Sequence, residues 1–320
     1  MGNLKQGENK NDFSRRKFIK GSASAVAATS LLGVGSIAAA QDGTANKPED
    51  PDTSVRWKSK PGDLYNRTYG YGDKDVTGWK GRIVYGATIG ILQIECNIPM
   101  LPGDMGNPTT FDYPVIYESL GNLDPNWVLS PTPHPEVLKA TISACKRLEL
   151  QGVRAIIGNC GFFANYQTDV ASEINTPFFN GSLMQVPMLL NSIGQDKKVG
   201  IMTANGPMLE EAPALKNCGV QDKDMNRIVI YGNQDGEQML NCTLESGYLN
   251  PLALQKELID LGKKMVEDHP DVGAVVLECT EFPPHAYAIQ DALRLSVWDF
   301  TTMANFMHAG AMRAPFTGWM

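Results

Sequence analysis

Two short stretches of the chain, with their cysteines 119 positions apart, share one pattern of residue types. Residues 156–162 and 276–282 each contain an apolar run, a polar residue, a cysteine and a small residue, with a phenylalanine close behind. Each apolar run is typical of a buried parallel strand, which puts Cys160 and Cys279 at the C-terminal edge where open α/β sheets bind ligands. Two thiols facing one pocket could take a proton from one face of a carbon and return one to the other. The alternative is two buried core cysteines.

Thiol chemistry needs a thiolate, and a free thiol has a pKa of about 8.5. Both cysteines precede an expected helix start, where free backbone N–H groups and the helix dipole favour the charged form. We therefore expect both thiol pKa values to be lowered. Asn159, Thr280 and Glu281 stand beside the cysteines and add hydrogen-bonding groups.

Both cysteine stretches resemble motifs of a known superfamily. Residues 152–162 and residues 277–284 are similar to the first and second cysteine motifs of the aspartate/glutamate/hydantoin racemase superfamily, and the resemblance extends over roughly residues 81–306. Amino-acid racemases of this family usually read Cys-Asn-Thr at the first motif, whereas this chain reads Cys-Gly-Phe. That form is closer to the branch that includes algal dimethylsulfoniopropionate lyases, which residues 102–104 and 203–206 also resemble.

The resemblance implies cofactor-free acid–base chemistry at the carbon next to a carboxylate, with no metal. Cys160 and Cys279 would be the catalytic pair, and the substrate would contact residues beside them, which are Asn159, Gly161, Thr280 and Glu281. Proton return gives a racemase acting on a small carboxylate, which is the leading hypothesis. Loss of a β-substituent gives a lyase of the dimethylsulfoniopropionate type. Loss of CO2 gives a decarboxylase, as in the more distant arylmalonate decarboxylases.

Further candidate site residues come from loops after other expected strands. Asn107 and Thr109 could reach the site, with a glycine–proline turn as an equal alternative. Ser182 follows an expected strand and could instead be a helix N-cap. Thr203 and Asn205 could bind a carboxylate at a helix start.

Three further groups of residues are assigned to packing or to solvent. Tyr166 is expected to pack, and His285 to face solvent, with a place beside Cys279 as its alternative. The other candidates for packing are Cys145, Cys218 and Cys242.

The order of apolar runs and helical patterns predicts a parallel α/β fold. Strands are expected at 82–94, 153–159, 176–183, 198–203, 227–231, 273–278 and 297–299. Helices are expected at 135–150, 207–217, from 250 or 251 through about 265, up to 292, and at 301–311. The spacing of the cysteine strands predicts two pseudo-symmetric lobes, each with a parallel sheet flanked by helices, and an active site in the cleft between them.

Four segments follow from this organisation. Residues 1–40 are expected to form a signal peptide, 41–80 a polar arm, 81–195 the first lobe, completed by about 295–320, and 196–294 the second lobe. The signal peptide carries a twin-arginine motif at residues 14–20 and ends in three alanines before Gln41. A lone amphipathic helix or a membrane anchor is the alternative. Cleavage would leave a periplasmic or secreted protein with no permanent membrane span.

Charge and composition restrict the partners. The chain has 320 residues and a net charge of -7, and without residues 1–40 the net charge is about -11. Such an acidic body argues against nucleic acid as a partner. Nucleotide and metal motifs are missing from the sequence. A homo-oligomer is one possible assembly. A periplasmic solute-binding protein is the non-enzymatic alternative.

Overall fold

Two parallel sheets with the same internal order form the framework of the protein. The computed structural model describes residues 84–121, 123–243, 246–313 and 316. The first sheet is four-stranded in the order β2-β1-β3-β4, and the second is four-stranded in the order β6-β5-β7-β8. The strands of the first sheet are β1 (Ile89–Gln93), β2 (Val115–Ser119), β3 (Ala155–Gly158) and β4 (Phe178–Phe179), and those of the second are β5 (Lys198–Thr203), β6 (Ile228–Gly232), β7 (Val272–Leu277) and β8 (Ser296–Trp298). The predicted α/β fold with two pseudo-symmetric lobes is confirmed.

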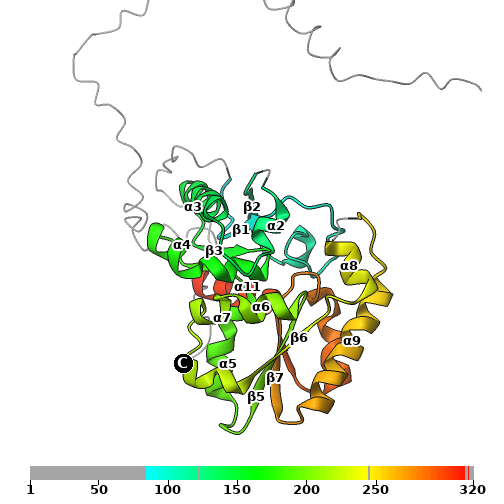
Figure 1. Ribbon diagram of the computed structural model, residues 1–320. Coiled ribbons are helices and arrows are strands. Elements are labelled where there is room, and N and C mark those ends of the chain that lie inside the picture. Colours follow the sequence, from blue (N-terminus) through cyan, green and yellow to red (C-terminus); the bar gives the residue numbers. More distant parts are fainter. Residues whose placement is uncertain (1–83, 122, 244–245, 314–315, 317–320) are drawn as a thin grey trace, which may run out of the picture. The chain divides into compact units, whose positions relative to one another are not determined.

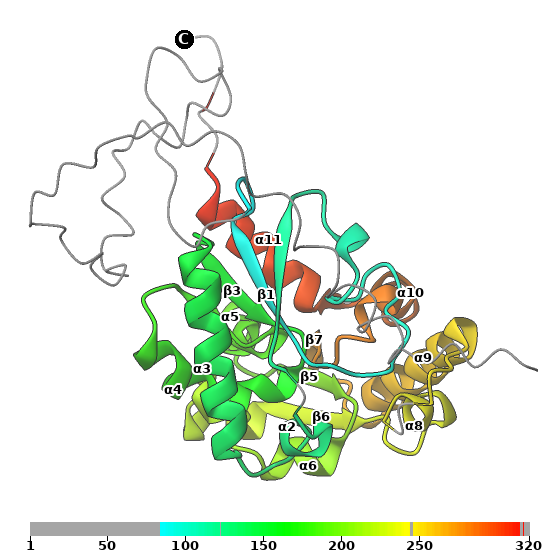
Figure 2. The ribbon, with the colours of Figure 1, turned by 90° about the horizontal axis from the view of Figure 1, so that it is seen from above.

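The first lobe buries both faces of its sheet. Leu92 and Ile156 point to the face covered by α3 (Pro135–Leu150), whose apolar side includes Leu148. Ile91 and Ile157, one position away on the same strands, point to the face covered by α11 (Phe300–Ala311). This alternation is the period of two that a strand imposes on its side chains. Figure 2 shows α3 and α11 on opposite sides of β1 and β3.

The second lobe repeats the arrangement. Ile201 and Val276 face α5 (Val186–Ser192), whereas Met202, Val275 and Leu277 face α9 (Pro251–Asp268). Figure 1 shows α5 and α9 on opposite sides of β5 and β7. Shorter helices complete both lobes, namely α2 (Pro125–Val128), α4 (Gln167–Glu173), α6 (Gly206–Glu211), α7 (Ala214–Asn217), α8 (Glu237–Thr243) and α10 (Ala286–Leu293). The carboxyl ends of β3 and β7 therefore belong to equivalent central strands.

Local capping explains where the long helices begin. Asn250 accepts a hydrogen bond from the Ala253 N–H at 3.2 Å at the start of α9, as expected for an N-cap before proline. Asp299 and Thr302 form a capping box at the start of α11. Because β8 ends at Trp298, only one residue separates the second sheet from a helix that packs on the first.

Several elements differ from the predicted ones. The sequence patterns did not predict β2, and the strand expected over 82–94 is confined within the described residues to β1. The helix expected over 207–217 is two helices, α6 and α7, because Pro213 stands between them. The predicted signal peptide and polar arm, residues 1–80, lie outside the described residues and stay predictions. Within the described part, none of the helices has the length and hydropathy needed to span a membrane.

Candidate active site

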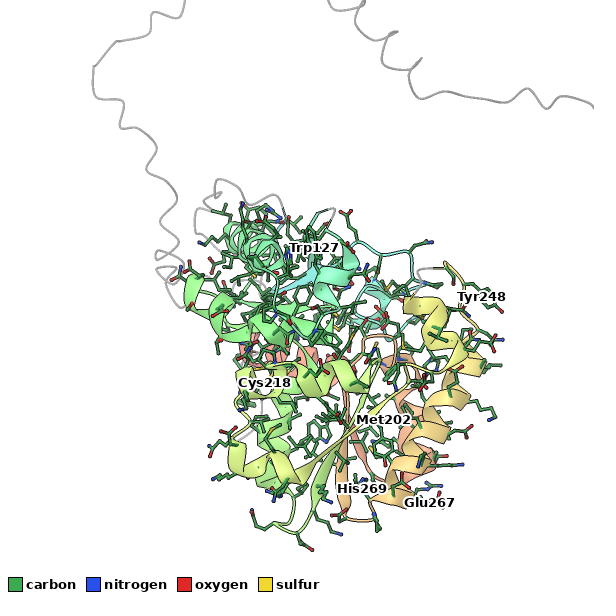
Figure 3. The ribbon with its side chains drawn as sticks, viewed as in Figure 1. Trp127, Met202, Cys218, Tyr248, Glu267 and His269 are labelled. Atoms are coloured by element: carbon green, nitrogen blue, oxygen red, sulfur yellow. The ribbon has the colours of Figure 1, made fainter. Side chains whose placement is uncertain are left out.

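The two cysteine motifs have the same backbone structure. The N–H of Asn159, before Cys160, donates to the Leu92 carbonyl at 3.0 Å. The N–H of Glu278, before Cys279, donates to the carbonyl of Met202, labelled in Figure 3, at 2.8 Å. Each cysteine carbonyl then accepts the N–H three residues later, at 3.1 Å for Cys160 and 3.2 Å for Cys279. Both thiols therefore stand in equivalent turns at the carboxyl ends of β3 and β7.

The two thiols differ in their contacts. Cys279 is 9% exposed, and its thiol donates a hydrogen bond to Glu281 Oε2 at 2.6 Å. Cys160 is half-buried and precedes the 3-10 helix η4 (Gly161–Tyr166), where the N–H of Phe162 bonds to it. All six cysteines of the chain lie in the described part and none forms a disulfide. Both site cysteines are therefore in the reduced form, and neither sulfur is tied up in a disulfide.

The pKa values of both thiols are raised, contrary to the expectation from the helix starts. Burial is the largest cause at both, since it disfavours a thiolate. The charge of Glu278 comes next at Cys160, and the charge of Glu281 comes next at Cys279. The backbone N–H groups act in the expected direction but are outweighed. The same two glutamates act on both sulfurs, so the structure brings the predicted cysteines around one acidic pair.

Three carboxyl groups from both lobes form this acidic cluster. Burial, and after it the charge of Glu281, raise the pKa of Asp104 to about 8. Burial raises the pKa of Glu278 to about 7 and also raises that of Glu281. Asp104 accepts hydrogen bonds from the Gly106 N–H at 2.6 Å and from the Thr280 hydroxyl at 3.1 Å. The cluster therefore favours neutral carboxyl groups or a cation among them.

Close contacts between the loops of the two lobes hold this cluster together. Gly103, in the left-handed region at φ +106°, lies against the Pro284 backbone, which a Cβ at residue 103 would approach to 2.8 Å. Gly161 lies against Glu278 in the same way. With the Thr280–Asp104 bond, these contacts join the loops that follow β1, β3 and β7. Five predicted residues are thereby gathered together, namely Cys160, Gly161, Cys279, Thr280 and Glu281.

Four other predicted residues have their side chains occupied by hydrogen bonds to other protein groups, and Thr203 is bonded to the acidic cluster itself. Asn159 Oδ1 accepts the Ile94 N–H at 3.1 Å. Asn107 caps its own loop, since it accepts the Thr109 N–H and hydroxyl and donates to the Met100 carbonyl. Asn205 accepts the Met208 N–H at 3.1 Å as the N-cap of α6. The hydroxyl of Thr203 donates to Glu278 Oε2 at 2.7 Å.

The remaining residues are buried. Ser182 is fully buried, the N-cap of its 3-10 helix is Gly181, and the Ser182 hydroxyl has no hydrogen-bond partner within the described part. His285 is buried at 4% exposure, so the expectation that it faces solvent is wrong. Tyr166 is buried and its hydroxyl accepts the His134 N–H at 2.7 Å, as expected of a packing residue. The candidates for packing are buried as well, namely Cys145, Cys218 (labelled in Figure 3) and Cys242.

Two residues of the site were absent from the predicted set. Asp104 lies within the 102–104 motif, and Glu278 directly follows β7, whose residues are all apolar. A charged residue directly after an apolar strand is a usable signal, because burying it costs free energy unless it has a role or a partner. Across the ranges that the structure describes, His, Cys, Asp and Glu form no group of three that could hold a metal ion.

Comparisons with known proteins identify the relatives of the chain. No family model matches it. It is 32% identical to a dimethylsulfoniopropionate lyase of Durusdinium sp. clade D over 240 residues, which cover 72% of this chain and 77% of that protein. It is 30% identical to dimethylsulfoniopropionate lyase 7 of Emiliania huxleyi over 237 residues, which cover 72% of this chain and 69% of that protein.

Solved structures of similar fold share less of the sequence. An aspartate racemase homologue from Pyrococcus horikoshii is 16% identical with a TM-score of 0.46, covering 71% of this chain and 99% of its own. Unliganded arylmalonate decarboxylase is 15% identical with a TM-score of 0.44, covering 72% of this chain and 94% of its own.

Proposed function

The chain belongs to the dimethylsulfoniopropionate lyase family, and on that premise we propose that it is a lyase that releases dimethyl sulfide from dimethylsulfoniopropionate or a closely related β-sulfonio carboxylate. The family resemblance of the two cysteine motifs agrees with these relatives. An enzyme of this family needs a base for a proton on the carbon next to a carboxylate. The matching geometry of the two motif turns supplies two thiols for that task.

The acidic cluster is the observation that carries the proposal. Within the described part of the chain, the charged groups that raise the pKa of either thiol are Glu278, Glu281 and, at Cys160, Cys96. Asp104 adds a third carboxyl group next to Glu281. Buried carboxylates without a cationic partner cost free energy. A substrate with a positively charged sulfur supplies that partner, whereas a substrate with a second carboxylate is repelled.

Cys279 is the base in this proposal because its proton already has an acceptor. The thiol proton moves to Glu281 Oε2, 2.6 Å from the sulfur, and leaves a thiolate. The thiolate takes the α proton, and the electron pair of the broken C–H bond forms the α–β double bond. The β carbon–sulfur bond breaks, and its electron pair leaves with neutral dimethyl sulfide. Acrylate is the other product, and the proton on Glu281 is released to solvent.

A racemase is the second candidate, favoured by one observation. An elimination needs one base, yet the chain has thiols at equivalent positions on both lobes. Abstraction by one thiolate and return from the other thiol inverts a stereocentre. A small carboxylate with a cationic substituent would fit the same acidic surroundings.

The experiment gives the full-length protein dimethylsulfoniopropionate and measures dimethyl sulfide in the headspace and acrylate by proton NMR. Parallel reactions in D2O contain small chiral carboxylates, and exchange of the α proton is followed. Equal amounts of dimethyl sulfide and acrylate are expected from the wild-type protein and from Cys145→Ala, which removes a buried thiol in α3. Exchange with inversion but no dimethyl sulfide would identify a racemase. Binding of these acids with neither exchange nor product would overturn the enzymatic proposal.

A further inference from the structure

Glu278 is a buried carboxyl group with one oxygen satisfied and one left over. The residue is 1% exposed. Oε2 accepts the Thr203 hydroxyl at 2.7 Å, and the carboxyl group also accepts the Ala204 N–H. Oε1 has no hydrogen-bond partner among the described residues. An unpaired buried carboxyl oxygen is costly, so its position calls for a reason.

That free oxygen lies against the turn that carries the other thiol. A Cβ at residue 161 would stand 1.8 Å from Glu278 Oε1 and 2.6 Å from the Glu278 carbonyl oxygen. Only glycine leaves room for this approach, which explains why Cys160 is followed by Gly161 in this chain. The carboxyl group of the second lobe therefore ends beside the backbone of Cys160 in the first.

Several titratable groups face Cys160. Among their charges, that of Glu278 raises the pKa of the Cys160 thiol most. Glu281 and Cys96 act in the same direction, and Tyr166 packs nearby. Glu278 itself faces Glu281, Cys160, Cys279 and Cys218. The pKa of Glu278 is about 7, so the group is ionised over the alkaline range in which a buried thiol titrates.

We propose that Glu278 is a positioning residue that keeps the proton on Cys160, so that Cys160 stays a thiol while Cys279 acts as the base. Glu281 can take the proton of Cys279 through a direct hydrogen bond, whereas Glu278 acts on Cys160 as a charge. The kinetic consequence rests on the proposed function, but the protonation of Cys160 can be measured without turnover.

The test measures the alkylation of each cysteine by iodoacetamide in the full-length protein between about pH 6 and 10.5, with mass spectrometry to separate the sites. Glu278→Gln keeps the shape and removes the charge. We expect the alkylation midpoint of Cys160 to fall by on the order of one pH unit, since a like charge nearby raises a thiol pKa by about that much. The matched control is Glu211→Gln, at an exposed position, which should leave the midpoint unchanged.

An unchanged Cys160 midpoint in a folded Glu278→Gln protein would overturn the proposal. If that variant does not fold, Glu278→Asp and Glu278→Asn make the same comparison at equal size, and only the asparagine variant should show the lowered midpoint. The alkaline limb of the pH–rate profile should move down with the Cys160 midpoint. A midpoint shift without any lyase or exchange activity in the wild type would support the role of Glu278 and reject the proposed function.

Discussion

The residues before the two cysteines, Asn159 and Glu278, make matching hydrogen bonds but have chemically different side chains. Each backbone N–H bonds to a carbonyl of a central strand, and each side chain accepts the N–H two residues further along the chain, just past the strand end, which is Ile94 for Asn159 and Ala204 for Glu278. The hydrogen bond of the shorter Asn159 side chain stays within the first lobe. The glutamate is one methylene longer and carries a charge, and its second oxygen reaches the opposite lobe. Matching backbones can therefore hold two thiols in unequal electrostatic surroundings.

The residues after the cysteines differ in a complementary way. Gly161 gives up its side chain to admit Glu278, whereas Thr280 uses its hydroxyl to hold Asp104 of the first lobe at 3.1 Å. Both contacts are made by second-lobe side chains that reach the first lobe. The second motif therefore supplies the side chains for both contacts between the lobes, and the first lobe supplies the groups that they meet.

Removing each thiol in turn is the strongest test of whether the two cysteines have different roles. Cys279→Ala should lower kcat by about 1,000-fold, because a positioned general base contributes roughly 100- to 10,000-fold. Cys160→Ala should cost at least tenfold less if elimination is the reaction. The measurement is steady-state release of dimethyl sulfide, with Cys145→Ala as the control. Equal losses in both variants would indicate a two-base reaction and would favour the racemase.

The acidic cluster should make stability depend on pH. The pKa of Asp104 is about 8 in the folded protein against 3.8 when unfolded, so the folded state holds the proton more tightly. Its contribution is complete below about pH 4 and is lost as the pH rises through about 8. We expect the free energy of unfolding to fall by about 1 kcal/mol per pH unit in this window. Urea denaturation at pH 5, 6.5 and 8 measures this fall.

Asp104→Asn should flatten that dependence. Glu278 and Glu281 also have raised pKa values, so part of the slope should persist in the variant. A variant that keeps the full slope would show that Asp104 is not protonated in the folded protein at neutral pH.

The space at Gly161 is tested by adding one methyl group. Gly161→Ala should destabilise the protein by about 2 kcal/mol, because the new Cβ meets a buried carboxyl group. Gly310→Ala is the matched control, since nothing lies within 4 Å of its Cβ position in α11. That change should be neutral or stabilise by up to about 1 kcal/mol through helix propensity. Chemical denaturation of both variants measures the change in the free energy of unfolding for each. A Gly161→Ala variant as stable as the wild type would remove the steric explanation.

The smallest effect is expected at the hydroxyl of Thr280. Thr280→Val removes its hydrogen bond to Asp104 and should cost about 1 kcal/mol of stability. Thr280→Ser keeps the hydroxyl and should recover most of that loss. If both variants lose the same amount, the methyl group of Thr280 rather than its hydrogen bond supports the contact.

Much of the framework was predictable because it depends on local patterns. The apolar runs before Cys160 and Cys279 predicted buried parallel strands, and their positions gave two lobes. The strand β2 was missed because its apolar pattern is weak, and only Ile116 among its five residues is buried. The proline that divides α6 from α7 was read as part of one helix, although the effect of proline on a helix interior is well defined.

The electrostatics of the site could not be predicted from local sequence. Asp104 and Thr280 are 176 positions apart, and no pattern within either loop indicates their hydrogen bond. The expectation of lowered thiol pKa values considered only the backbone donors beside each cysteine. Burial and two glutamates outweigh those donors, and both effects depend on how the lobes pack.

The matching strand order of the two sheets has a stereochemical consequence. On the proposed mechanism Cys279 alone takes the α proton, so only the hydrogen of the prochiral CH2 group on its side is removed, and the acidic side chains beside the two sulfurs decide which thiol is the base. Since the backbone around both thiols is the same, a descendant of this chain could reverse that choice by moving one acidic side chain from the second motif to the first. The handedness of the reaction would then be inverted while the fold stayed as it is.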